Sequence, residues 1–254
     1  MAPEPVAFES GRGLKLIGDR YPGGPSAIVL CHGFTGDRHE EGRLDETARA
    51  LNEDGFTVLT FDFGGSGESD DAPITIEGET EDLLAALAFT REQDAERVGI
   101  LGLSYGAWVA CRAAAVTPID AFVFWAPFVT AVADPTVWYS NEQLDELDRT
   151  GLMTWGKDAG PRRHVVIAGR HLEEVRRLDQ RALLGAITHP VLVLHGNKDD
   201  IVPLAASRKA MRLLPKGSKL RVVRGADHVF HAQLPTFIEH TRRWFRAWQD
   251  AAGR

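Results

Sequence analysis

Cysteine is scarce in this sequence, and long apolar runs are missing. Only two cysteines, Cys31 and Cys111, occur in 254 residues. Two cysteines cannot build the disulfide framework of a small secreted protein, so we expect a reducing, cytoplasmic location. No apolar stretch approaches the roughly 20 residues that span a bilayer. Residues Met1–Pro5 have neither the basic nor the apolar segment of a signal peptide. The sequence therefore predicts no membrane partner.

Positive charge is also in short supply. The chain has 29 Lys and Arg residues against 36 Asp and Glu residues, which gives a formal net charge of −7. Domains that bind nucleic acids usually carry a basic stripe, so no nucleic-acid partner is expected. Nothing in the sequence indicates an oligomeric state.

The motifs of metal and nucleotide sites are missing as well. His228 and His231 are close in sequence, but no H-E-x-x-H motif and no Cys/His cluster completes a metal site. The glycine-rich segment Gly64–Gly67 has neither a Walker lysine nor G-x-G-x-x-G spacing. Cys31 stands next to a histidine, but its position at the end of an apolar run is typical of a core residue. We therefore predict no metal and no other cofactor.

What the sequence does contain is a regular alternation of apolar runs and helical patterns. Apolar residues make up 44% and charged residues 26%, the balance of a globular protein with one core. Short apolar runs, typical of strands buried on both faces of a parallel sheet, occupy residues 27–31, 56–61, 98–103, 121–125 and 191–194. A more polar run at 219–223 is expected toward a sheet edge. Helical patterns cover residues 43–52, 79–92, 105–115, 204–214 and 231–250. The alternation predicts an α/β protein with helices on both faces of a mostly parallel sheet.

The alternation lapses between residues 127 and 189. Helical pieces are expected at Asn141–Arg149 and Leu172–Leu184, and His164–Ala168 could form one strand of a small hairpin. We interpret residues 127–189 as an insertion into a core formed by residues 1–126 and 190–254, rather than as a linker between two domains.

A candidate nucleophile lies at Gly102–Gly106, which reads Gly-Leu-Ser-Tyr-Gly and fits G-x-S-x-G. The motif follows an apolar run directly and precedes an Ala-rich helical stretch, which is the strand–turn–helix setting that it requires. The small residues on either side let the backbone form a strained, tight turn, so the Ser104 side chain would stand at the end of the strand. Unpaired backbone N–H groups at the start of the helix can face a developing anion. A glycine-rich turn with a passive serine is the alternative.

Four further motifs stand in a consistent order. They are His32–Phe34 after the first strong strand, Asp62–Ser69 with the pattern D-x-x-G-x-G-x-S, His195–Asp199 followed by Val202-Pro203, and Gly225–His228. Together with the serine motif they resemble the α/β-hydrolase family, and within it the cinnamoyl or feruloyl esterases and the serine aminopeptidase-like hydrolases. The resemblance implies an α/β-hydrolase fold with an inserted lid after the sixth strand. Gly65 stands where many relatives carry histidine, with little consequence expected for the chemistry.

The family order of serine, acid and histidine implies roles for individual residues. Asp199 has the position of the acid, and Asp200 is the competing carboxylate. His228 follows the run at 219–223 and has the position of the general base, with His231 as its rival. His240 falls inside the terminal helical pattern and is expected at the surface.

The same fold implies an oxyanion hole made of two backbone N–H groups. One belongs to Tyr105, directly after the nucleophile, and the other to Phe34 in the loop after the first strong strand. His32 and His195 are expected to support their loops by hydrogen bonds.

In this fold an insertion after a strand ending near Trp125 usually arches over the nucleophile. The aromatic residues Trp138, Tyr139 and Trp155 are the predicted substrate-binding residues, and packing as lid core is the alternative for each. The sequence thus predicts a carboxylesterase that hydrolyses short-chain or aryl-acyl esters of small molecules through an acyl-serine intermediate. Peptide or amide cleavage, acyl transfer, and a non-catalytic binding protein of the same fold remain the alternatives.

Overall fold

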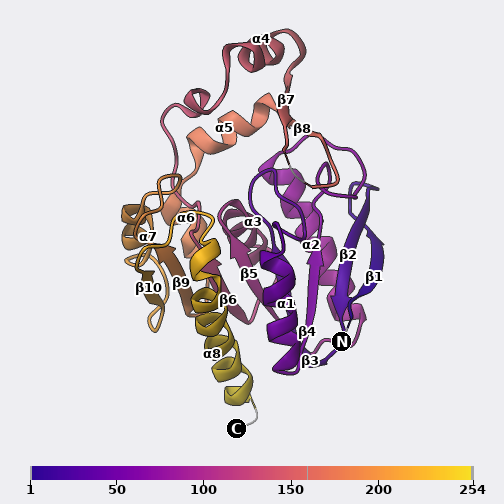
Figure 1. Ribbon diagram of the computed structural model, residues 1–254, viewed down its shortest axis with the longest axis vertical. Coiled ribbons are helices and arrows are strands. Elements are labelled where there is room, and N and C mark those ends of the chain that lie inside the picture. Colours follow the sequence, from indigo (N-terminus) through magenta and orange to yellow (C-terminus); the bar gives the residue numbers. More distant parts are fainter. Residues whose placement is uncertain (1, 159, 253–254) are drawn as a thin grey trace.

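The centre of the computed structural model, which describes residues 2–158 and 160–252, is an eight-stranded sheet with the order β1-β2-β4-β3-β5-β6-β9-β10 (Figure 1). The strands are β1 Glu4–Glu9, β2 Lys15–Tyr21, β3 Gly24–Cys31, β4 Phe56–Phe61, β5 Arg97–Leu103, β6 Ala121–Trp125, β9 Val191–Gly196 and β10 Lys219–Val223. The six strands from β4 to β10 in this order are parallel, whereas β1 and β2 pair antiparallel with their neighbours. The predicted mostly parallel sheet is therefore confirmed.

The inner strands are apolar along almost their whole length. β3, β4, β5, β6 and β9 are buried nearly throughout, as strands covered on both faces must be. β10 is more exposed and lies at an edge, as its polar character predicts. The apolar runs do not predict β1 and β2. β1 lies at the opposite edge of the sheet and alternates exposed and half-buried residues, so it contains no apolar run.

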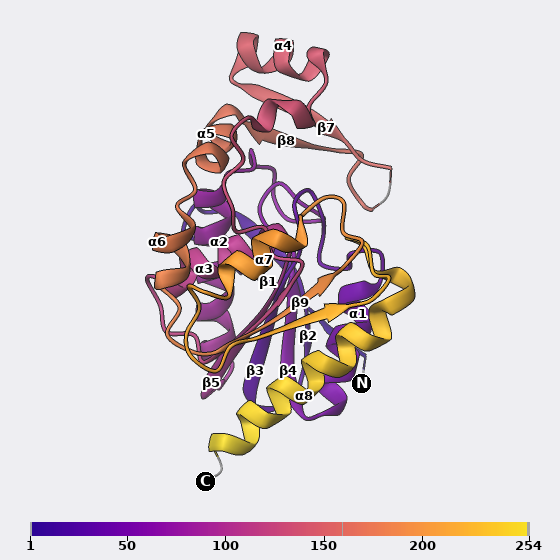
Figure 2. The ribbon, with the colours of Figure 1, turned by 90° about the vertical axis from the view of Figure 1, so that its left-hand side faces the viewer.

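Helices cover both faces of the sheet (Figure 2). Helices α2 Ile76–Glu92, α3 Tyr105–Ala114, α6 Gln180–Gly185 and α7 Leu204–Ala210 pack on one face, and α1 Arg43–Glu53 and α8 Leu234–Ala252 pack on the other. Helix α7 ends at Ala210, before the predicted Leu214, and turns complete the segment before Pro215. Within residues 2–158 and 160–252, none of the helices combines the length and the apolar character that crossing a bilayer requires.

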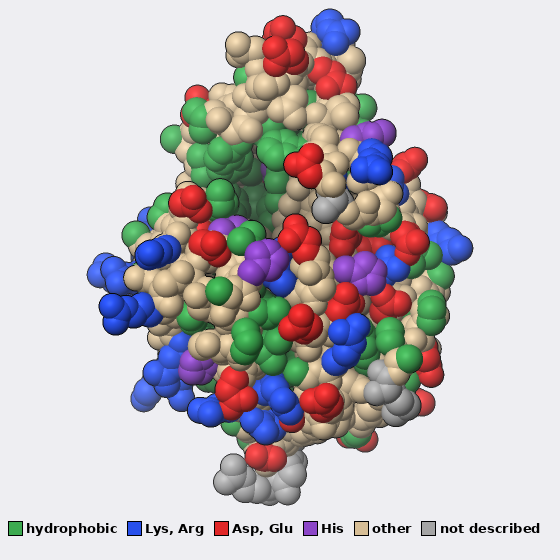
Figure 3. Space-filling model, viewed as in Figure 1, with side chains coloured by type: hydrophobic (Ala, Val, Ile, Leu, Met, Phe, Trp, Pro, Cys, Tyr) green, Lys and Arg blue, Asp and Glu red, His purple; other side chains and the backbone are tan. Residues whose placement is uncertain are grey.

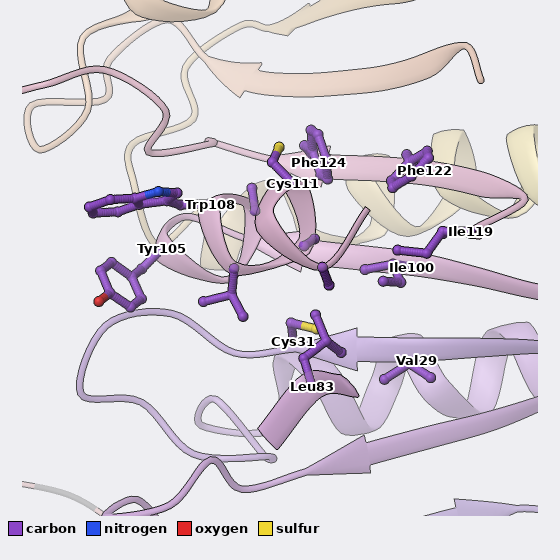
Figure 4. Close-up of a cluster of buried hydrophobic side chains, with 14 of the residues drawn as sticks. Val29, Cys31, Leu83, Ile100, Tyr105, Trp108, Cys111, Ile119, Phe122 and Phe124 are labelled. Atoms are coloured by element: carbon purple, nitrogen blue, oxygen red, sulfur yellow. The ribbon is translucent and has the colours of Figure 1, made fainter. Parts of the chain in front are cut away.

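Both cysteines lie in the apolar cluster between α2, α3 and the sheet (Figure 4). Cys31 ends β3 and Cys111 belongs to α3, and both side chains are fully buried. Burial raises the pKa of each thiol above its ordinary range, so neither is activated as a nucleophile. The interpretation of both cysteines as core residues is confirmed.

Most of the segment between β6 and β9 that was predicted to be an insertion forms a separate layer beyond the ends of the strands (Figure 1). It contains the 3-10 helix η1 Pro135–Trp138, α4 Asn141–Thr150, the hairpin of β7 Leu152–Gly156 and β8 His164–Ala168, and α5 Gly169–Arg177. The expected hairpin is confirmed, but the single helical piece expected over Leu172–Leu184 is wrong. The chain leaves the helical conformation at Leu178, and the Asp179 side chain then accepts the N–H groups of Arg181 and Ala182 to begin α6.

Backbone contacts at the start of α2 attach this layer to the core. The N–H of Ile74 donates to the carbonyl of Val166 in β8 over 2.8 Å. The Glu174 carboxylate of α5 accepts the N–H groups of Ile76 at 2.8 Å and Glu77 at 3.3 Å, which are free donors at the start of a helix. Helix α5 is therefore held in a defined position relative to α2.

Candidate active site

Ser104 stands at the turn between β5 and α3. Its φ of 51° and ψ of −111° lie in a region that few residues other than glycine adopt. A Cβ on Gly102 would lie 2.6 Å from the Cα of Ala107, and one on Gly106 would lie 2.6 Å from the carbonyl oxygen of His32. The two glycines of the motif are therefore required by close backbone contacts, which hold the serine in its strained turn.

His228 and Asp199 approach Ser104 from two neighbouring strand ends. Asp199 follows β9 and His228 follows β10. Nε2 of His228 lies 3.1 Å from Oγ of Ser104, and its Nδ1 donates to Oδ2 of Asp199 over 2.9 Å. The carboxyl ends of parallel strands meet at one edge of a sheet, which brings these distant residues together. The three predicted residues form one continuous hydrogen-bonded chain.

The Asp199 carboxylate is buried and surrounded by donors. Oδ2 lies 2.9 Å from His228 and 3.2 Å from Nε2 of His195, and Oδ1 accepts the N–H groups of Ile201 at 3.0 Å and Val202 at 2.8 Å. Burial alone would raise the pKa of Asp199, but hydrogen bonds from His195 and His228 outweigh it and hold that pKa well below its ordinary range. The carboxylate is therefore ionised at neutral pH and can stabilise a charged His228.

The rival residues have other surroundings. Nε2 of His231 lies 3.2 Å from Glu41 in a solvent-exposed pair. His240, expected at the surface, is half-buried on α8. Asp200 is exposed, and it makes no hydrogen bond to His228 in the part of the chain that the structure describes. The geometry favours His228 over both other histidines and Asp199 over Asp200.

The backbone N–H groups of Phe34 and Tyr105 are free beside the serine, with no hydrogen-bond partner among the described residues. Tyr105 is the first residue of α3, where N–H groups lack partners within the helix. Phe34 follows Gly33, whose own N–H donates to Oε1 of Glu40 over 2.6 Å. Arg43 donates to the other carboxylate oxygen of Glu40 over 2.8 Å. This network holds the loop after β3 and leaves the Phe34 N–H available to an anion.

His32 and His195 contact their own loops and not the serine. Nδ1 of His32 donates to the next carbonyl over 2.8 Å, and its Nε2 accepts the N–H of Phe63 at 3.2 Å. Nε2 of His195 donates to the Val202 carbonyl over 2.8 Å, and its Nδ1 accepts from the Ser207 hydroxyl at 2.8 Å. Both rings are buried with both nitrogens engaged, so they support the loops as expected.

The turn at Asp62–Ser69 is also a support. The Asp62 carboxylate accepts the N–H groups of Arg38 at 2.7 Å and Glu68 at 2.9 Å. Gly65 has a φ of 85°, and a Cβ there would lie 2.1 Å from the carbonyl oxygen of Ala72. A side chain at position 65 would require a different turn, which accounts for the glycine in this chain.

Ser104 lies at the wall of a cavity of about 560 Å³ beneath the inserted segment, visible as a hollow lined by hydrophobic side chains in Figure 3. Trp138, Tyr139 and Trp155 all line this cavity. The rings of Tyr139 and Trp155 meet edge to face at 5.7 Å, and Trp138 meets Phe128 in the same way at 5.8 Å. These residues pack against one another and also face the cavity, while their contact with a substrate stays a prediction.

Residues 28–240 match the model of the alpha/beta hydrolase family. The chain belongs to this family. An uncharacterized protein of Mycobacterium tuberculosis is 29% identical over 230 residues, which cover 88% of this chain and 71% of that relative. The monoacylglycerol lipase of Mycolicibacterium smegmatis is 25% identical over 230 residues, which cover 79% of this chain and 80% of the lipase.

Solved structures of this hydrolase family share the fold. Est1E of Butyrivibrio proteoclasticus with bound ferulic acid superimposes with a TM-score of 0.76 at 22% identity, covering 96% of this chain and 99% of Est1E. The predicted fold class is therefore confirmed.

The hydrolase motifs did not point to His171 on α5. Its ring is buried, its Nδ1 lies 3.1 Å from the Tyr105 hydroxyl, and it stacks on Phe34 at 4.9 Å and 11°. Burial lowers the pKa of His171 to about 4, so the ring is neutral at ordinary pH. His171 therefore contacts the side chains of both residues whose N–H groups are free. Its one sequence signal is a place on the buried face of α5, together with Leu172 and Val175.

Proposed function

We propose that this protein is a serine hydrolase that cleaves carboxylic esters. Ser104 is the nucleophile, His228 is the general base, and the Asp199 carboxylate orients the His228 ring. The hydrogen-bonded chain from Asp199 to Ser104, beside two free N–H groups in an apolar cavity, carries this proposal. Each part has a defined task in acyl transfer.

In the first half of the reaction, His228 accepts the Ser104 proton while Oγ attacks the ester carbonyl. The 3.1 Å separation is within hydrogen-bond reach for this transfer. Negative charge develops on the carbonyl oxygen, where the N–H groups of Phe34 and Tyr105 stabilise it. Asp199 stabilises the His228 imidazolium, which then protonates the leaving alkoxide and leaves an acyl group on Ser104.

In the second half, His228 removes a proton from water, which attacks the acyl-serine carbonyl. The Ser104–acyl bond breaks, His228 returns the proton to Ser104, and the carboxylic acid leaves. Residues 127–189 act as a lid on the core of residues 1–126 and 190–254 and limit access of bulk water to the cavity.

The preferred acyl groups are short chains and aromatic acids. Trp138, Ile201 and Val229 are exposed apolar residues that line the same cavity. Tyr139 and Trp155 extend the aromatic lining inward, and a flat acyl ring stacked on such a side chain gains about 0.5–1.5 kcal/mol per pair. The ferulic acid bound to Est1E supports an aromatic acyl group, whereas the name of the Mycolicibacterium lipase supports a fatty chain. The aromatic lining favours the first.

The decisive experiment on the nucleophile is Ser104→Ala. A fluorophosphonate should label the wild type at Ser104, and the variant should hydrolyse p-nitrophenyl butyrate more slowly by about 10⁴-fold or more, because the variant loses the hydroxyl that lies 3.1 Å from Nε2 of His228. Ser66→Ala is the matched control, since Ser66 is buried outside the cavity. Labelling at another residue, or robust turnover by Ser104→Ala, would refute the assignment.

A substrate panel tests the specificity and the alternatives that share the triad. We expect a higher kcat/KM for methyl ferulate and p-nitrophenyl butyrate than for p-nitrophenyl palmitate, because aromatic rings form a large part of the cavity lining. Trp138→Ala and Trp155→Ala should lower kcat/KM for the ferulate by about three- to tenfold each, the loss of one ring pair. A preference for palmitate would contradict the aryl pocket. Faster cleavage of an aminoacyl anilide would favour amidase activity. Formation of a new ester with an added alcohol, in place of the free carboxylic acid, would favour acyl transfer.

A further inference from the structure

A second cavity lies where the ends of α5 and α6 meet α7, on the side of the molecule that faces the viewer in Figure 2. Its volume is about 840 Å³, and among the described residues it shares no lining side chain with the cavity at Ser104. We call it the basic groove, after the polar side chains that line it: Arg176, Arg177, Gln180, Arg181, Lys209 and Arg212.

Positive charge gathers in this groove although the chain carries a net charge of −7. Arg176 and Arg177 at the end of α5 are partly balanced by Glu173, at 3.4 and 3.1 Å, and Arg176 also lies 3.9 Å from Asp134. The other three cations, Arg181, Lys209 and Arg212, form no ion pair within the described part of the chain. Lys and Arg side chains stand together at this edge of the molecule, on the left of Figure 3.

The carboxylate of Asp179 also lines the groove, where it caps the start of α6. Its Oδ1 accepts the N–H groups of Arg181 at 2.8 Å and Ala182 at 3.1 Å at the start of α6. These donors are neutral, so Asp179 keeps its full negative charge, but it faces five cations in the groove, and three of them form no ion pair among the described residues.

A buried amide adds a second, independent observation. Gln180 is 7% exposed, its Nε2 donates to the Thr130 hydroxyl over 2.9 Å, and its Oε1 is buried without a partner among the described residues. The Thr130 hydroxyl can equally donate to the amide oxygen, which turns the NH₂ group toward the unpartnered position. A buried polar atom without a partner is unfavourable, so a ligand that enters the groove far enough to accept from this NH₂ group relieves that cost.

We propose that the basic groove binds a phosphorylated small molecule of nucleotide size, at a site independent of the ester chemistry at Ser104. Guanidinium groups bind phosphate oxygens through paired, charge-assisted hydrogen bonds, and the Gln180 amide supplies a further donor. Leu178, Leu213 and Ala131 offer apolar surface for the rest of the ligand. The volume falls within the range of roughly 300–1,000 Å³ that is usual for small-molecule sites. A long nucleic acid would need a basic stripe, whereas these cations are confined to one hollow.

Calorimetric titration of the full chain with ADP, inorganic pyrophosphate and adenosine, at about 0.15 M salt, tests the ligand class. Saturable binding of ADP and pyrophosphate at one site per chain, with no binding of adenosine, is expected because the phosphates make the charged contacts. The proposal is overturned if adenosine binds as tightly as ADP, or if neither phosphate compound binds saturably.

A pair of charge-matched variants locates the site. Arg181→Gln/Lys209→Gln/Arg212→Gln removes the unpaired cations of the groove, and Lys15→Gln/Arg149→Gln/Arg163→Gln removes three exposed cations elsewhere. Each changes the net charge from −7 to −10, that is by −3. We expect the groove variant to bind ADP at least about tenfold more weakly, because it loses the charged hydrogen-bond donors that would contact the phosphate oxygens. The control should stay within about twofold, since salt screens distant charges. Equal weakening in both variants would show only general attraction of anions and overturn the site.

Discussion

Asp199 and Asp200 are neighbours of the same type, and what distinguishes them is the set of groups around each carboxylate. Asp199→Asn should lower kcat/KM by about 10³–10⁴-fold, because an amide presents an N–H to His228 and favours the wrong imidazole tautomer. Asp200→Asn, the matched control, should change kcat/KM by no more than about threefold, because Asp200 is exposed and solvated. Steady-state kinetics with p-nitrophenyl butyrate decides between them. A larger loss in Asp200→Asn would move the acid to position 200.

His228 and His231, the two candidates for the general base, also differ in the groups that surround them. His228→Ala should reduce kcat/KM about as much as Ser104→Ala, because nucleophile and base act as a unit. His231→Ala should keep nearly full activity, since its ring pairs with Glu41 in an exposed position. The measurement is again kcat/KM, together with fluorophosphonate labelling. Rapid labelling of His228→Ala and slow labelling of His231→Ala would assign the base to His231.

Among the helices and strands, the sequence predicts best the strands that are buried on both faces of the sheet. β5 and β9 had to be apolar throughout because helices cover both faces, and their ends carry the residues that meet at the site. β1 escapes prediction because an edge strand with one partner needs little apolar surface. The break between α5 and α6 depends on one capping contact of Asp179, which a helical periodicity does not reveal. The contact of α5 with Tyr105 is equally hidden, because it joins segments 66 residues apart.

Helix α5 carries a prediction of its own, because its His171 contacts both Phe34 and Tyr105. His171→Ala should lower kcat/KM by about 10- to 70-fold, the combined effect of a lost hydrogen bond of about 1 kcal/mol and a lost ring contact of about 0.5–1.5 kcal/mol. The loss should fall mainly on kcat, since N–H groups that shift by a fraction of an ångström stabilise the transition state less. Glu173→Gln on the exposed face of α5 is the control. His171 also lines the cavity at Ser104, so a rise in KM alone would mean that it acts on substrate binding rather than on the two N–H groups.

At the scale of the whole molecule, one buried carboxyl group opposes folding at neutral pH. Glu79 on α2 is 2% exposed, and neither carboxyl oxygen has a hydrogen-bond partner in the described chain. Burial, helped by nearby Asp82, raises the pKa of Glu79 well above its ordinary range, although Arg12 acts in the opposite direction. A raised folded pKa means that folding favours the protonated group. The contribution of the protonated Glu79 carboxyl to stability is complete below the pKa of about 4.3 that it has in the unfolded chain. This contribution is lost as the pH rises toward the pKa of Glu79 in the folded protein.

Glu79→Gln should therefore stabilise the protein increasingly as the pH rises, because glutamine has nearly the same shape and carries no charge that must be neutralised or buried. We expect a gain in the free energy of unfolding of at least about 1 kcal/mol near pH 8 and a much smaller gain near pH 4.5. Urea unfolding of both proteins at the two pH values measures this difference. Glu81→Gln, on the same helix with its side chain 46% exposed, is the control and should show no such trend. A gain of equal size at both pH values would mean that packing, rather than the proton of Glu79, separates the variant from the wild type.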